Sequence, residues 1–522
     1  MNKFFSLALI GFCVFTCHTS VAQSYAEESL IFSRIVPGGS ARIQALGGAQ
    51  TALGGDYSSA YSNPAGLGFY NKSEATLSLG NSFYNSSSNY LGQNTSGANS
   101  NFHVPGFSIV LHSDKNNGKL ISGNFAISFN RINNFNKTFN YTGTNTNNSM
   151  IDSFIQQSDG ADPSQFSAGN NSTSPGALYY TLPWLGYQNY LFGPSSEINP
   201  NGDSTLYHTY VSGIPLQKEK VQTSGAQNQW NIAYGLNFND FFYVGGSLGI
   251  VSLNYQSAKK YTESFSSGPL NRFELDENLS VTGTGINATL GVIVKPKDFI
   301  QFGLSASSPT AYPTLTENYS ATLSSSWNNY LYQDVTYPSK NTVLNSQSAS
   351  MSYSTPFLYG LATPWRLRGG VTVFIEKHGF ITADVEKVNY QKSSFSSNAN
   401  TPYDFSQDNH SIATGLRNVF NFHAGGEYRY QKYHLRAGYS YMPDPYSQIQ
   451  NGVSNAVTGY TGGLGYRTGK YFVDLGFVLT QWKSTYLPYS IYQSATALDP
   501  NSPIVNLNHS NPTVLVTFGF TL

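Results

Sequence analysis

Residues 227–254 read QNQWNIAYGLNFNDFFYVGGSLGIVSLN, and this stretch decides the fold of the chain. Large apolar residues recur at every second position on both sides of Asn239 and Asp240. Successive side chains of a β-strand point to opposite faces, so this period predicts two strands with one apolar face each. That face carries Trp230, Ile232, Tyr234, Leu236, Val244, Leu248 and Ile250, and the opposite face carries Asn231, Ala233, Gly235, Gly245, Ser247 and Gly249. Residues 227–254 are therefore predicted to form a β-hairpin.

The same pattern continues from residue 74 to Leu522. Tight turns alternate with long polar loops, as in a bacterial transmembrane barrel with short turns on the periplasmic side. The predicted turns are 113–118, 239–240, 295–298, 377–378, 431–432 and 468–470. The predicted strands are 74–84, 103–112, 119–131, 227–238, 241–254, 280–294, 299–308, 365–376, 379–390, 418–430, 433–442, 458–467, 471–482 and 513–522.

These strands define an all-β fold, an antiparallel transmembrane β-barrel of about 14 strands. The even number agrees with single-chain bacterial barrels, and it predicts that both mature ends lie on the turn side. We assign residues 309–363 to one loop, with 319–323 as a candidate strand extension above the membrane.

Composition favours a membrane-facing surface and excludes a nucleic-acid binder. The 28 basic residues are balanced by 28 acidic ones, whereas nucleic-acid binding requires a basic excess. Charged residues make up only 11% of the chain, and 38 Tyr and 34 Phe are present. Aromatic residues crowd the predicted turns, which is where an interfacial girdle belongs; the alternative is the ordinary β-propensity of Tyr and Phe.

The N-terminus is interpreted as a secretory signal. Lys3, the apolar residues 4–15 and the small residues 20–22 predict a signal peptide over 1–22. Cys13 and Cys17 both lie within it, so the mature chain has no cysteine for disulfides or thiolate metal sites. The mature chain then divides into an N-terminal segment, 23–73, and the barrel, 74–522, and we expect no cofactor or metal.

Residues 23–73 lack the strand period and are rich in Gly and Ala. Asp56 is placed to cap a short helix beginning at Tyr57, and Pro64 limits that helix. A compact segment ahead of a barrel suggests a hatch packed inside the lumen, and the alternative is a periplasmic tail.

Within this segment, residues 39–67 contain ALGGA, then GGD, then NPAG. This run resembles the N-terminal hatch of the FadL/TodX family of outer-membrane transporters of long-chain fatty acids and other hydrophobic compounds. Weaker similarity follows in SASSP (305–309), DVE (384–386) and RAGY (436–439). The resemblance implies a fourteen-stranded barrel with an internal hatch, and it assigns the hatch or gating motif to Asn63, Pro64, Ala65 and Gly66.

Alternation divides the predicted lumen into two walls. The strands from 227 to 308 turn small neutral residues inward. The later strands turn charged residues inward, and Arg368 is predicted to face Glu386 across the turn at 377–378. This polar wall comprises Arg366, Arg368, Asp384, Glu386, His423, Glu427, Arg429, Arg436 and Asp474. It is interpreted as a scaffold that holds the hatch, and the alternative is docking of a substrate carboxylate.

Two further regions are candidate sites. An apolar loop cluster is a candidate capture surface for a hydrophobic ligand, and the alternative is loop packing over the barrel mouth. Its residues are Tyr180, Trp184, Tyr187, Tyr190 and Phe192. Pro105 and Gly106 interrupt one strand and Gly123 lies in the next, which marks a candidate lateral opening.

Catalytic motifs such as HExxH and GxSxG are missing from the sequence, so no enzyme is expected. We predict a monomeric outer-membrane channel of a Gram-negative bacterium, with membrane lipid and a hydrophobic small molecule as partners. Passive uptake of long-chain fatty acids or aromatic hydrocarbons is the main functional hypothesis. The alternative is an interaction or shuttle protein of a protein-secretion system, because fold alone does not settle function.

Overall fold

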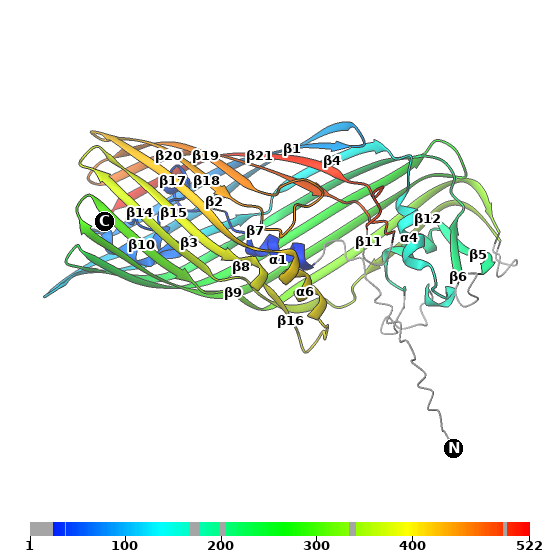
Figure 1. Cartoon of the computed structure of the whole chain (residues 1–522), viewed down its shortest axis with the longest axis horizontal. Helices are drawn as coiled ribbons and strands as arrows, with labels where there is room; N and C mark the ends of the chain where they lie inside the picture. The colour runs from blue at the N-terminus through cyan, green and yellow to red at the C-terminus, as the bar shows by residue number, and fades with distance from the viewer. Residues whose placement is uncertain (1–24, 37, 167–177, 199–204, 334–340, 494–497) are drawn as a thin grey trace, which may run out of the picture.

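The computed structural model describes residues 25–36, 38–166, 178–198, 205–333, 341–493 and 498–522. The predicted signal peptide, with Cys13 and Cys17, lies outside the described residues. The rest forms a closed antiparallel barrel whose long axis is horizontal in Figure 1. Within the described residues, no helix is both long and apolar enough to cross a membrane.

Fourteen strands close the barrel, as predicted, because the last strand pairs with the first. Each neighbouring pair is antiparallel, from the hairpin of the first two strands round to the last. In ring order they are β1 (Glu74–Tyr90), β2 (Gln93–Asn117), β3 (Leu120–Asn134), β7 (Pro215–Phe238), β8 (Phe242–Phe265), β9 (Leu270–Lys297), β10 (Ile300–Ser307), β14 (Arg366–Ile375), β15 (Gly379–Asn389), β17 (Asn418–Tyr430), β18 (Tyr433–Met442), β19 (Val457–Arg467), β20 (Tyr471–Tyr486) and β21 (Val505–Thr521).

Several strands continue far beyond the predicted segments on the long-loop side. The described residues of the interval 309–363, assigned above to one loop, form three strands instead, and 319–323 lies inside the first of them. The extensions are β4 (Lys137–Thr144), β11 (Ala311–Tyr332), β12 (Thr342–Ser352), β13 (Phe357–Ala362) and β16 (Ser394–Ser397). They extend one side of the barrel much further from the turn end than the other side, as the long green strands of Figure 1 show.

The extensions reverse the polarity of the barrel faces. In the lower part of β8 the apolar residues Leu248 and Ile250 point outward and are exposed. In β11 the apolar residues Tyr319, Ala321 and Leu323 are buried, whereas polar residues such as Ser324 point outward. The reversal follows from the surroundings, because lipid favours an apolar outer face and water favours a polar one.

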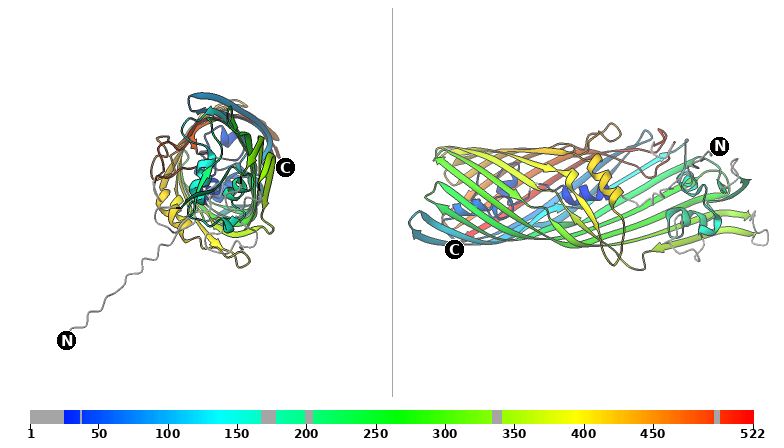
Figure 2. Two further views of the ribbon diagram at one scale, coloured as in Figure 1. Left: turned by 90° about the vertical axis from the view of Figure 1, so that its right-hand side faces the viewer. Right: turned by 60° about the horizontal axis from the view of Figure 1, so that its bottom comes forward.

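The N-terminal segment lies inside this wall. It contains α1 (Tyr25–Ser33), α2 (Ala41–Gln44), α3 (Ser59–Ser62) and the 3-10 helix η1 (Pro64–Phe69), and it is drawn in blue within the barrel in both views of Figure 2. The first helical turn expected at Tyr57 begins at Ser59, and Asp56 Oδ1 accepts a hydrogen bond from the Ser58 backbone N–H at 3.0 Å. Asn63 instead caps η1, because its side chain accepts from the Ala65 backbone N–H.

The two ends of the described chain lie in opposite halves of the barrel. Leu522 is at the turn end, where its backbone N–H donates to the Ser73 carbonyl at 2.9 Å. Tyr25, however, makes edge-to-face contacts with Phe395 and Phe405 among the long loops. The prediction that both ends lie on the turn side is therefore wrong for the first described residue, because the segment runs down the lumen before β1 begins.

An insertion between β4 and β7 fills the upper end of the tall wall, shown in cyan in Figures 1 and 2. A large aromatic core joins it to the inner faces of β8, β9 and β11. Its elements are α4 (Met150–Ser158), η2 (Pro163–Phe166), α5 (Leu182–Gln188), β5 (Phe192–Ile198) and β6 (Thr205–Thr209). Two further helices, η4 (Tyr390–Lys392) and α6 (Ser406–Gly415), lie between β15 and β17 in the chain.

Candidate functional site: the lumen and the segment that fills it

The neutral wall contacts the N-terminal segment through small residues and backbone groups. Asn63 Nδ2 donates to the Thr51 carbonyl at 2.6 Å and to the Val292 carbonyl of β9 at 3.3 Å. Gly245 and Gly291 face the same place, where a methyl group would collide with the Pro64 carbonyl or with the Asn63 side chain. Small residues on this wall therefore permit close backbone approach.

The predicted motif residues sit at the centre of this contact. Asn63 is 1% exposed, and the other three motif residues, Pro64, Ala65 and Gly66, are buried as well. The Asn63 side chain links three elements: it caps η1, it bonds to the backbone at Thr51, and it bonds to β9. An Asn-Pro pair is suited to this place, since Asn supplies a cap and Pro fits the first helical position.

The charged wall holds the segment with side chains. Asp384 of β15 accepts hydrogen bonds from the backbone N–H groups of Gln50 and Thr51, both at 2.7 Å. His423 of β17 donates through Nδ1 to the Gly47 carbonyl at 2.9 Å. Asp384 and His423 are directly opposite one another in the β15–β17 ladder, so they form one continuous polar surface.

The predicted Arg368–Glu386 pair is present. The two residues are opposite in the β14–β15 ladder, and Arg368 Nε lies 2.9 Å from Glu386 Oε2. Arg366 Nη1 lies 2.5 Å from the other oxygen of Glu386, and its Nη2 donates to the Ser33 carbonyl of α1. The Arg368 guanidinium also lies 5.6 Å from the centre of the Tyr61 ring. Both arginines therefore share one carboxylate and contact the N-terminal segment.

A second charged network lies nearer the turn end. Arg436 bridges two carboxylates, with Glu427 at 2.7 Å and Asp474 at 2.6 Å. Arg42 of α2 approaches Glu427 at 3.8 Å, and Arg467 binds Asp474 at 3.0 Å. Glu427 also pairs with Arg429 and His434. The sequence missed Arg42 and Arg467, because Arg42 lies outside the strands and Arg467 ends one.

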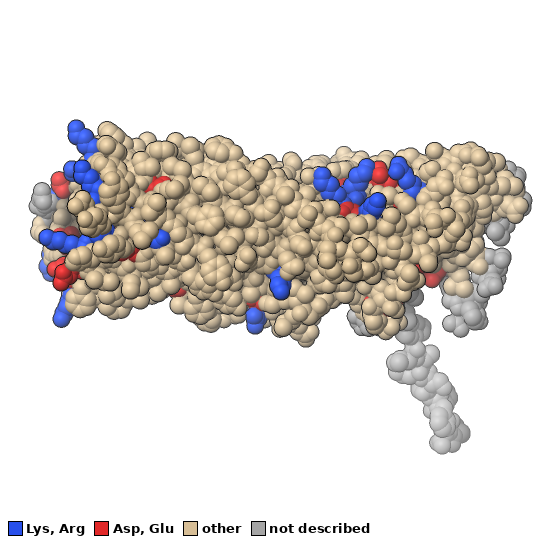
Figure 3. Space-filling view, turned by 90° about the horizontal axis from the view of Figure 1, so that it is seen from above, with Lys and Arg blue, Asp and Glu red and all other residues tan. Residues whose placement is uncertain are grey.

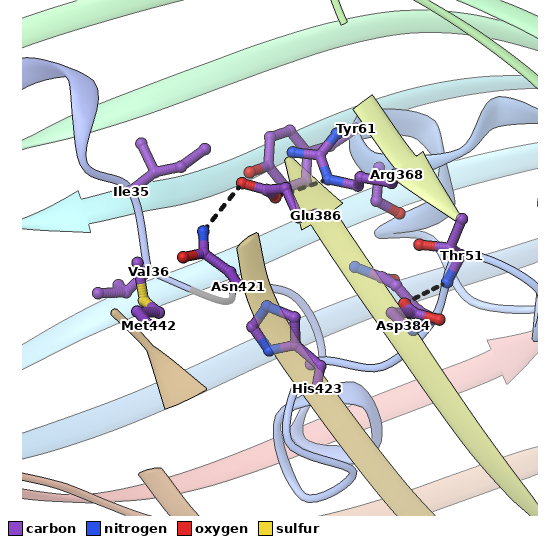
Figure 4. A pocket seen from close by; sticks show the side chains of 14 residues that line it. Ile35, Val36, Thr51, Tyr61, Arg368, Asp384, Glu386, Asn421, His423 and Met442 are labelled. Atoms are coloured by element: carbon purple, nitrogen blue, oxygen red, sulfur yellow. Dashed lines mark hydrogen bonds and ion pairs between the residues drawn. The ribbon is translucent and has the colours of Figure 1, made fainter. Parts of the chain in front are cut away.

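Eight of the nine predicted wall residues are buried, and Arg429 is half-buried with its side chain 32% exposed. Several of these residues line a small pocket between the wall and the N-terminal segment, shown in Figure 4. Its lining includes Ile35, Thr51, Tyr61, Arg368, Asp384 and Asn421. A second pocket shares Ile35, Tyr61 and Arg368 with the first.

The top of the N-terminal segment carries a buried acid. Glu28 of α1 accepts a hydrogen bond from the Tyr359 hydroxyl. Burial raises the pKa of the Glu28 carboxyl to about 8, and the nearby negative charge of Glu317 adds to this shift. A raised pKa means that the protonated acid is the favoured form in this place.

The candidate capture residues are mostly packed. Phe192 is 1% exposed, and Tyr187 stacks on Phe166 with ring centres 4.4 Å apart. Trp184 Nε1 donates to the Phe166 carbonyl at 3.0 Å, and Tyr190 contacts Tyr332. Tyr180 is the exposed member of the set, at 46%.

The candidate lateral opening falls at a real change in strand pairing. The β2–β3 ladder runs from the pair Gly106–Asn130 toward the turn end. From Gly106 toward the long loops, the described residues of β2 are joined to β3 and β4 by side-chain hydrogen bonds. Asn134 donates to Asn101 at 3.3 Å, and Thr95 donates to the Asn140 carbonyl of β4 at 2.6 Å. A register shift at Ser78–Gly80 places a bulge in β2 at the same height, beside Pro105. Gly123 pairs with Ser113, away from this break.

Tyr57 of the N-terminal segment lies behind the break. A Cβ added at Gly106 would be 2.5 Å from the Tyr57 hydroxyl, which also bonds to Ser78 at 3.0 Å. Outside, Phe107, Phe129 and Trp230 cluster just below the break. The break therefore begins at the upper part of the apolar belt and is backed by one aromatic ring.

Comparison with solved structures identifies the class of fold. A FadL homologue from Pseudomonas aeruginosa has a TM-score of 0.52 at 12% identity, covering 93% of this chain and 99% of its own. The P. putida toluene transporter TodX has a TM-score of 0.50 at 13% identity, covering 93% and 99%. No protein-family model matches the chain, and no curated protein matches it in sequence. The chain has a FadL/TodX-like fold, and the predicted resemblance is confirmed at that level.

Proposed function

We propose that this protein is an outer-membrane channel that passively carries hydrophobic small molecules, such as long-chain fatty acids or aromatic hydrocarbons. The fold likeness supports the class, since the similar structures are a FadL homologue and a toluene transporter. In this proposal residues 23–73 act as a hatch, and no catalytic step or cofactor is involved.

One observation carries the proposal: the N-terminal segment fills the lumen at the level where the pairing of β2 with β3 ends. Residues from Gly47 to Asn63 contact both walls, which leaves little room for a water-filled pore. At the break, Tyr57 stands between the lumen and the membrane. A lateral exit there suits a hydrophobic cargo, because the molecule reaches the bilayer without crossing water.

The inner cations are a weak site for a substrate carboxylate in this proposal. Arg366 and Arg368 already share Glu386, and each has a further acceptor in Ser33 or Ser307. We therefore assign the charged wall to holding the hatch. At the mouth, Tyr180 is the capture residue that remains accessible to ligand.

A reversible cross-link tests the lateral route. Asn101→Cys with Asn134→Cys joins β2 to β3 across the break, where the two side chains already contact one another. Uptake of labelled oleate and toluene by cells should fall when the disulfide is formed and recover after reduction.

The control joins the same strands below the break. Ser108→Cys with Ser128→Cys links residues that are opposite in the intact ladder, and it should leave uptake unchanged in both redox states. Equal uptake by the oxidised and reduced forms of the first variant, with the cross-link confirmed, contradicts the lateral exit. Normal uptake by cells lacking the whole chain contradicts transport itself and favours the secretion-related alternative.

A further inference from the structure

Basic residues gather at the turn end of the barrel, at the left of Figure 3, where acidic residues also lie. The short connections there, taken together with the last residues of β2 and β9, are residues 71–73, 113–119, 239–241, 295–299, 376–378, 431–432 and 468–470. They hold eight lysines, namely Lys72, Lys115, Lys119, Lys295, Lys297, Lys377, Lys432 and Lys470, which we call the rim lysines. The same connections hold only four acidic residues, Asp114, Asp240, Asp298 and Glu376.

The whole chain is neutral, with 28 basic and 28 acidic residues, so the rim makes it electrically asymmetric. Eight basic and four acidic residues at the rim leave 20 basic and 24 acidic residues for the remainder. These segments therefore carry a formal excess of four positive charges. Outside them and the predicted signal peptide, which holds Lys3, the chain has 19 basic and 24 acidic residues. A neutral total conceals this separation of charge.

The rim lysines are also largely free of protein carboxylates. Lys295 pairs with Asp298 at 2.9 Å. In the described part of the chain, the other seven have no ion pair with a carboxylate, and they are exposed. In the long-loop half, by contrast, Lys260 lies between Glu274 at 2.6 Å and Asp276 at 3.8 Å. The rim lysines are therefore available to an anionic partner outside the chain. Among the described residues, Lys218, Lys220, Arg272 and Lys483 of the other half likewise have no ion pair, so position rather than pairing distinguishes the rim.

The position of the rim identifies that partner. Exposed aromatic side chains flank the same connections, among them Phe241, Phe299, Tyr430, Tyr433 and Tyr471. Aromatic girdles mark the height of the lipid headgroups, and lysine reaches that layer with its ammonium while its methylenes stay against apolar surface. A ring of ammonium groups at this height faces the headgroups of the periplasmic leaflet.

We propose that the rim lysines form a binding surface for anionic phospholipid headgroups in the periplasmic leaflet. Each lysine near such a surface adds a favourable electrostatic contribution that salt weakens within a Debye length. The surface encircles the base of the barrel, because the lysines come from six of the seven connections. This anchoring fixes the barrel's height against the leaflet, and it stands independently of the transported substrate.

Lipid binding to the full chain in a neutral detergent tests this inference. Native mass spectrometry compares retained phosphatidylglycerol with retained phosphatidylethanolamine at equal lipid concentration. The native chain should retain the anionic lipid in excess. The variant Lys115→Gln, Lys297→Gln, Lys377→Gln, Lys432→Gln should lose that preference by at least about fivefold, because four ammonium groups are removed.

The matched control removes four cations from the other half of the barrel. Lys218→Gln, Lys220→Gln, Arg272→Gln and Lys483→Gln change exposed residues of β7, β9 and β20 and alter the net charge equally. This variant should keep the phosphatidylglycerol preference. The inference is overturned if the rim variant retains the anionic lipid like the native chain, or if the control variant loses it to the same extent. Heat-modified migration on gels confirms that both variants are folded barrels.

Discussion

The two walls of the lumen hold the same N-terminal segment by different chemistry. The wall from β7 to β10 uses Gly245 and Gly291, which let the backbone around Pro64 approach the strands. The wall from β14 to β20 uses charged side chains, such as Asp384 on the backbone N–H groups of Gln50 and Thr51. The neutral wall holds the segment because its small residues leave space for the backbone. The charged wall holds it because each buried ion has a partner.

This difference predicts two kinds of sensitivity. A buried ion that loses its partner is strongly destabilising, because the remaining charge stays out of water. An added methyl group at a close contact forces the backbone to shift, and the effect depends on how easily the neighbours move. Removing a charged side chain from the charged wall should therefore lower the stability of the chain. On the neutral wall, adding a methyl group to a glycine should lower it.

The largest expected effect comes from deleting the N-terminal segment, which both walls hold. Deletion of residues 25–70, keeping the secretory signal, should convert a closed barrel into an open pore for ions and small polar solutes. The lumen lining is polar on both walls, so water fills it once the segment is gone. Single-channel recording in planar bilayers measures the change. An unchanged conductance would mean that the insertion between β4 and β7 seals the barrel by itself.

Glu427→Ala should give the next largest effect. It leaves Arg436 with one carboxylate and Arg42 with none at this position, and loss of one partner of a buried pair costs about 3–5 kcal/mol. Urea unfolding of the chain in phospholipid vesicles measures the free energy of unfolding. Glu376→Ala, at an exposed turn, is the control and should change it by less than about 0.5 kcal/mol. Equal effects of the two substitutions would show that the charged network does not hold the segment.

The smallest expected effect distinguishes neighbouring glycines on the two faces of β8. Gly245→Ala places a methyl group against the Pro64 carbonyl and should destabilise the chain by about 1–3 kcal/mol while loosening the segment. Gly246→Ala points outward, where the nearest atom is the flexible end of Leu290 at 3.3 Å, and should be close to neutral. Limited proteolysis near Arg42 reports loosening. Equal protection in both variants would show that close approach at Gly245 is not required.

Local periodicity was sufficient to place the barrel strands. Alternation at positions such as Trp230 and Ile232 identified the lipid face, and it also identified Arg368 and Glu386 as inward neighbours across one turn. Their ion pair could be predicted because both residues belong to one hairpin with a fixed register. The motif from Asn63 to Gly66 marked the N-terminal segment as compact and distinct from the strands.

The upper half of the barrel was missed for a physical reason. Residues 311–332 still alternate, but their apolar side chains point inward to a core of loops and helices, and the positions that point to water are mostly Ser, Thr and Asn. The sequence signal used for the lower half is an apolar outer face, and this signal ends where the surroundings change from lipid to water.

The sequence by itself determined the number of membrane strands, their faces and the small, neutral character of one wall, since these depend on a period of two residues. Tertiary structure alone decided that Arg42 meets Glu427, that Tyr57 stands behind the break at Gly106, and that Tyr25 lies among the long loops. Closing the barrel around the segment brings together residues that are 49 to 385 positions apart in the chain. No local pattern encodes them, because they arise only when the last strand pairs with the first.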